Sequence, residues 1–150
     1  MKFVRSVLAI LAGFVSMAIP TMGVFAVSAF AFGREVLMPE DQARAPVWFS
    51  LGIMVVGLAC TMLGGFVCAK VARSWTPVMF FAAIVLVFGI FGAIDNERKP
   101  EPGPEVAEMP ILEAVAHSKE PTWLAFGNPI VGALGVLLGG RLALRERIHT

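Results

Sequence analysis

The phrase Leu-Gly-Gly followed by basic residues occurs twice in this chain, as MLGGFVCAKVAR (Met62–Arg73) and as LLGGRLALRER (Leu137–Arg147). Each copy closes a long stretch that contains no Asp, Glu, Lys or Arg. Apolar stretches of roughly 20 residues cross the hydrocarbon core of a bilayer as helices, and basic residues follow such helices where they reach the cytoplasm. The two phrases therefore indicate the inner ends of two transmembrane helices.

The whole chain shows the same pattern, because four charge-free stretches cover residues 6–33, 45–69, 74–94 and 121–140. The chain is 57% hydrophobic and 15% charged, with a mean hydropathy of +0.79, whereas soluble domains carry about 25% charged residues. We predict an all-α membrane protein, a single domain over residues 1–150, with four transmembrane helices as two antiparallel hairpins. The outer loop 95–120 is acidic and Pro-rich, and its composition leaves open whether residues 106–118 form an interfacial helix.

The flanking basic residues predict the orientation. Five lie on the side with the longer loops, and seven lie close to helix ends on the side of the two Leu-Gly-Gly phrases: Lys2, Arg5, Lys70, Arg73, Arg141, Arg145 and Arg147. The positive-inside rule then places both termini in the cytoplasm of a bacterial inner membrane. Trp48 and Trp123 fall at outer helix ends and Trp75 at an inner end, where interfacial anchors are expected.

A shift of 75 residues aligns the second stretch with the fourth without a gap. Trp48 then matches Trp123, and Leu63-Gly64-Gly65 matches Leu138-Gly139-Gly140. Both stretches run from outside to inside, so the match predicts a parallel pseudo-repeat of the second and fourth helices. Independent convergence of two similar helix ends is the alternative.

Small residues recur at steps of three and four in both helices, which keeps them on one helix face. They are Gly57, Cys60, Gly64, Cys68, Gly132, Gly135, Gly139 and Ala143. Membrane helices associate through such faces because small residues let the backbones approach closely. We therefore predict that the second and fourth helices pack through these faces, either with each other or with another subunit.

Residue types that carry out chemistry are sparse. The two cysteines lie eight positions apart on one helix, the two histidines fall on opposite sides of the membrane, and no phosphate-binding glycine motif is present. We predict no catalytic residue, no metal site, no cofactor and no nucleic-acid partner. One candidate site lies inside a span, at Gly127, Asn128 and Pro129, where a broken helix would expose backbone dipoles to a substrate; a local kink is the favoured interpretation.

Three short motifs carry a resemblance: LAGFV at residues 11–15, LGGFVCAKVAR at 63–73 and LLGGRLAL at 137–144. With them the chain resembles a loose set of small bacterial four-helix membrane proteins without assigned function. Such proteins tend to show Pro-His-Pro before the Trp of the last helix, whereas this chain has Pro121-Thr122-Trp123. The resemblance implies the four-helix topology and no activity.

These observations favour a non-enzymatic membrane interaction or accessory subunit that packs through small-residue faces against other subunits, or against its own copies, in membrane lipid. The alternative is a small passive channel or carrier with its site at Gly127–Pro129. A third hypothesis, a lipid-, quinone- or pigment-binding bundle, rests only on the twelve phenylalanines.

Overall fold

The computed structural model describes residues 2–37, 47–100 and 119–146. Within these ranges the chain forms four long helices: α1 (Lys2–Leu37), α2 (Val47–Ala72), α3 (Trp75–Arg98) and α5 (Thr122–Arg145). Each of the four is long and apolar enough to cross a membrane. The prediction of an all-helical chain with four candidate membrane spans is therefore confirmed.

The helices continue beyond the charge-free stretches from which they were predicted. α1 ends at Leu37 rather than near residue 33, α3 at Arg98 rather than near 94, and α5 at Arg145 rather than near 140. Backbone hydrogen bonding does not stop where the first charge appears, because long charged side chains near a helix end can reach the membrane surface. Residues 95–98, predicted to open the outer loop, are thus helical, and residues 106–118 lie outside the described ranges.

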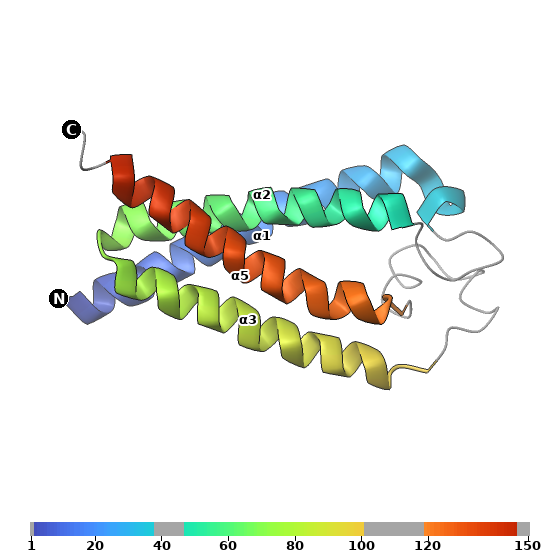
Figure 1. Cartoon of the computed structure of the whole chain (residues 1–150). Coiled ribbons are helices and arrows are strands. Elements are labelled where there is room, and N and C mark those ends of the chain that lie inside the picture. The colour runs from blue at the N-terminus through green and yellow to red at the C-terminus, as the bar shows by residue number, and fades with distance from the viewer. Residues whose placement is uncertain (1, 38–46, 101–118, 147–150) are drawn as a thin grey trace.

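The helices pack in the order α1, α2, α5, α3. α2 and α5 share the most extensive contact at the centre, α1 packs on α2, and α3 packs on α5 (Figure 1). Direct contacts of α3 with α2 and with α1 are much smaller. Figure 1 also shows both termini and the short α2–α3 turn at one end of the bundle, which we call the termini end.

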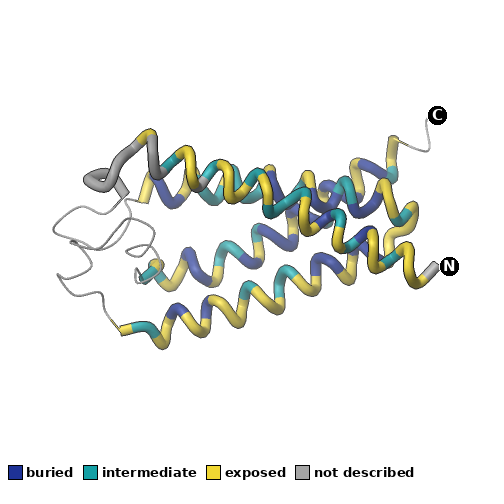
Figure 2. Tube along the Cα trace, turned by 180° about the vertical axis from the view of Figure 1, so that it is seen from behind, coloured by how far each residue is buried: buried dark blue, intermediate teal, exposed yellow. Residues whose placement is uncertain are grey.

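The buried core is built mostly from small side chains. Ala9, Cys68, Ala69, Ala82 and Ala143 belong to it, and Phe81 and Val78 are its largest fully buried members on α3. Apolar burial alone drives little association in lipid, so close backbone approach and dispersion contacts must hold these helices together. Figure 2 shows the buried positions as short stripes that alternate with exposed ones along each helix.

Polar contacts join the helices at the termini end. Arg5 Nε donates to the carbonyl oxygen of Val71 at 2.8 Å and so satisfies one of the last carbonyls of α2. Lys70 Nζ on α2 lies 2.8 Å from Glu146 Oε2, just after α5. Between α2 and α3 the chain turns through Arg73, whose φ of 58° is left-handed. The contacts of Arg5 and Lys70 hold the start of α1 and the end of α5 against the end of α2.

Candidate functional site

The two central helices, α2 and α5, approach each other closely where they cross. A Cβ at Gly139 would overlap the carbonyl oxygen of Met62, and a Cβ at Gly135 would overlap Thr61 Oγ1. The Thr61 hydroxyl donates back to the carbonyl of Leu58 at 2.9 Å, so this polar group is satisfied within its own helix. An added Cβ at Gly139 would require the α2 backbone to move, whereas one at Gly135 would first require the Thr61 side chain to move.

The contact is mirrored on α2, where a Cβ at Gly65 would overlap the carbonyl oxygen of Val136. Gly65 and Val136 are 71 residues apart in sequence, and Met62 and Gly139 are 77 apart, on either side of the 75-residue offset of the repeat. The two helices cross at corresponding positions, and they run in the same direction, because Lys70 near the end of α2 pairs with Glu146 just after α5.

The first glycine of the α2 phrase has a different neighbour. At Gly64 a Cβ would lie 2.8 Å from the carbonyl oxygen of Gly13 on α1, and at Gly13 a Cβ would lie 2.8 Å from the carbonyl oxygen of Gly64. In the α5 phrase, Gly139 faces α2 while Gly140 faces Val78 on α3. Consecutive residues point about 100° apart on a helix, so each Gly-Gly pair gives one helix close access to two neighbours at one level.

The other predicted packing residues are distributed among these contacts. A Cβ at Gly132 would lie 3.3 Å from Val85 Cγ1 on α3, and Cys60 and Ala143 are buried. Cys68 is buried beside Gly13 on the α1 side of α2. At Gly57, in contrast, no atom lies within 4 Å of a Cβ position. On α2, the predicted residues Gly64 and Cys68 thus face α1, whereas the contact with α5 is made by Gly65, which lies outside the predicted set.

The predicted helix break lies inside a continuous helix. α5 runs through Gly127, Asn128 and Pro129 without interruption. Pro129 is buried, and its ring fills a notch at Gly89 on α3, where a Cβ would lie 2.6 Å from Pro129 Cβ. Asn128 is half-buried, and the space beside Gly127 is open. Sequence reasoning missed Gly89, although a glycine in mid-helix is itself a signal of close approach.

Sequence reasoning also missed a pair of hydrogen bonds near the C-terminal end of α3, which we call the polar clamp. Asn96 is 8% exposed; its Nδ2 donates to the carbonyl oxygen of Glu120, and its Oδ1 accepts from the Glu120 backbone N–H, both at 3.0 Å. This amide joins the end of α3 to the residues that precede α5. Desolvation raises the pKa of the Glu120 carboxyl above its ordinary value, and the positive charge of Lys99 offsets part of that rise.

The remaining predicted residues lie near helix ends or apart from one another. Trp48, Trp75 and Trp123 stand within the first two residues of α2, α3 and α5 and are partly exposed. Cys60 and Cys68 are free thiols, and both histidines lie outside the described ranges. Among the residues that the structure describes, no three of His, Cys, Asp and Glu come together as metal ligands would.

Comparison of the chain with protein-family models, with curated proteins and with solved structures gave no match. The described geometry consists of tight glycine contacts, one polar clamp and helix surfaces rich in exposed apolar side chains.

Proposed function

We propose that this protein is a non-enzymatic subunit of the bacterial inner membrane that joins a larger membrane complex or a homo-oligomer. The observation that carries the proposal is the position of α1. This helix is the longest of the four, yet its main contact is with α2, beside a small one with α3. The open side of α1 offers a surface for a helix of another chain.

The exposed surface of α1 is extensive and apolar. Its large exposed side chains in the described ranges are Phe3, Val4, Val7, Leu8, Leu11, Phe14, Val15, Ile19, Met22 and Val27. Only 11% of the most apolar part of α1 is buried, against 50% for α5. α1 therefore contributes least to the interior of its own chain, although it is long enough to cross the bilayer with length to spare.

The sequence suggested that the small-residue faces bind the partner. In the structure they bear on the partner surface only indirectly, because the chain's own helices occupy them. Gly135 and Gly139 are occupied by α2, Gly64 by α1 and Gly140 by α3. These glycines hold the chain's own helices together, so a partner would bind elsewhere. We assign the partner to the exposed face of α1, because α1 is the least buried of the four spans, and that partner would be a transmembrane helix of matching apolar character.

The test is extraction of the native membrane in mild detergent, followed by native electrophoresis and mass spectrometry. We expect migration with an identified integral membrane protein or as a homo-oligomer. A photoreactive amino acid at Met22 should crosslink to that partner. The same probe at Phe88 on α3 is the matched control, because both side chains are 73% exposed. Monomeric migration, or equal crosslinking from the two positions, would contradict the proposal.

We further propose that the four helices insert as two antiparallel hairpins with both termini in the cytoplasm. Arg5, Lys70, Arg73 and Arg145 stand at or near helix ends on the termini end, which supports this orientation by the positive-inside rule. A reporter that is active only in the cytoplasm should be active when fused after Thr150. Activity there of a reporter that works only in the periplasm would overturn the orientation.

A further inference from the structure

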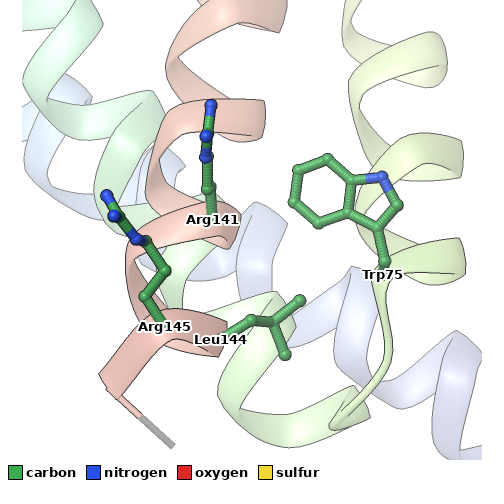
Figure 3. A pocket seen from close by; sticks show the side chains of 4 residues that line it. All are labelled: Trp75, Arg141, Leu144 and Arg145. Carbon is green, nitrogen blue, oxygen red and sulfur yellow. The ribbon is translucent and has the colours of Figure 1, made fainter. Parts of the chain in front are cut away.

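A shallow, open groove lies between the start of α3 and the end of α5. It is lined by Trp75, Arg141, Leu144 and Arg145 (Figure 3). In Figure 3 the Trp75 indole stands on α3 across the gap from the α5 side chains, and Leu144 extends from α5 toward the Trp75 side. The surface that lines the groove is almost wholly apolar. In Figure 3 the Arg141 and Arg145 side chains rise along α5 beside it, so the two guanidinium groups flank an apolar groove.

The two arginines have no counter-charge in the part of the chain that the structure describes. They stand four residues apart, which places them on one face of α5. The acidic residue next to them, Glu146, forms an ion pair with Lys70 on α2, whereas neither Arg141 nor Arg145 makes an ion pair with a described residue. Two neighbouring cations without a partner repel each other, and an anion bound between them would relieve that repulsion.

The start of α3 adds to the positive potential of the groove. Trp75 is the first residue of α3, and the side chain of the N-cap residue Ser74 makes no capping hydrogen bond. The first N–H groups of a helix lack partners within that helix, and the macrodipole places partial positive charge there. The arginines alone could be explained as favourable cations at the C-terminus of α5, but this does not explain why an apolar groove that begins at Trp75 lies beside them.

We propose that this groove binds an anionic glycerophospholipid of the phosphatidylglycerol type. The two guanidinium groups would hold the phosphate, since their planar N–H forks match its oxygens. The part of the acyl chain nearest the headgroup would lie against Trp75 and Leu144. The groove sits where the candidate spans of α3 and α5 reach their ends, at the depth where lipid headgroups meet tryptophan and arginine side chains.

This site goes beyond the proposed function. It needs neither a partner protein nor a particular sidedness of the membrane. A failed partner experiment would therefore leave the lipid site unaffected. A failed lipid experiment would likewise leave the proposed partner function unaffected.

The test uses the full chain with Trp48→Phe and Trp123→Phe, so that Trp75 is the remaining fluorophore, purified in neutral detergent. Phosphatidylglycerol with brominated acyl chains is added, and quenching of Trp75 is followed against lipid mole fraction. We expect half-maximal quenching at a lower mole fraction than with brominated phosphatidylcholine. Arg141→Gln combined with Arg145→Gln should raise that mole fraction about twenty-five-fold, from roughly fivefold per basic residue. High salt should weaken the quenching by phosphatidylglycerol as well.

The matched control removes one charge at the other end of α3. Arg98→Gln should leave the titration unchanged, while Arg141→Gln alone shifts it. All three arginines are exposed, so the folded state should survive each change, as thermal unfolding of each variant would check. Equal quenching by the two lipids, or an equal shift with Arg98→Gln, would overturn the proposal. Displacement of the lipid by millimolar inorganic phosphate would also overturn it, because the apolar wall would then contribute nothing.

Discussion

Gly139→Ala is expected to lower the free energy of unfolding by about 3 kcal/mol, at the upper end of the range for overpacked sites. The added methyl group would overlap the carbonyl oxygen of Met62. A backbone carbonyl cannot rotate away as a side chain can, so α2 and α5 would have to separate along their crossing. Their contact is the most extensive in the described part of the chain, and its loss would also loosen α1 and α3. Unfolding by denaturing detergent, followed by circular dichroism, measures the change.

Two alanine substitutions serve as controls for this prediction. Gly127→Ala lies on the same helix, and Gly57→Ala lies on α2; no atom stands within 4 Å of a Cβ at either site. Both variants should unfold at the same concentration of denaturing detergent as the parent protein or at a slightly higher one, because alanine has a higher helix propensity than glycine. A drop at Gly127 as large as that at Gly139 would show that the glycines act through backbone flexibility and not through close packing.

Asn96→Leu is expected to cost about 2 kcal/mol of folding free energy, because it removes two hydrogen bonds and leaves polar backbone groups of Glu120 without their partner. Leucine has the same number and branching of side-chain heavy atoms as asparagine, so the change removes the polar contact while it keeps the outline of the side chain. The substitution should act locally, by freeing the residues before α5 from the end of α3. The same detergent unfolding assay measures the loss.

Asn128→Leu is the matched control for the clamp. It makes the same chemical change in the half-buried residue Asn128, whose side chain forms no hydrogen bond with a described residue. This variant should keep the stability of the parent protein. If Asn128→Leu and Asn96→Leu lose equal stability, the clamp contributes no more than any asparagine at a helix surface, and the role assigned to Asn96 is wrong.

Much of the helical framework could be predicted from the sequence, because length and the absence of charge determine which stretches can cross a bilayer. All four candidate spans were found in this way. Their ends were less predictable, since α3 continues through Asp95 and Arg98. A charge marks the edge of the apolar layer, whereas a helix ends only where its backbone turns.

The neighbour of each small residue could not be predicted. Periodicity placed Gly64 on the predicted face of α2 and left Gly65 out, yet Gly64 meets α1 and Gly65 meets α5. The α1 contact itself had a signal, because Ala9 and Gly13 are small residues four positions apart in the first stretch. The Asn96 clamp had none, since its partner is a backbone group 24 residues away, and every residue has such groups.

The central pairing of α2 with α5 also fixes the order in which the fold can be completed. α2 leaves the ribosome about 75 residues before the matching part of α5, which at roughly 5–20 residues per second is a delay of about 4 to 15 seconds. During that interval Gly65 and Thr61 have no α5 to contact. A chain cut short before Thr122 would keep that surface uncovered permanently. Until α5 is made, the α2 surface around Gly65 and Thr61 thus lacks the helix that covers it in the complete fold.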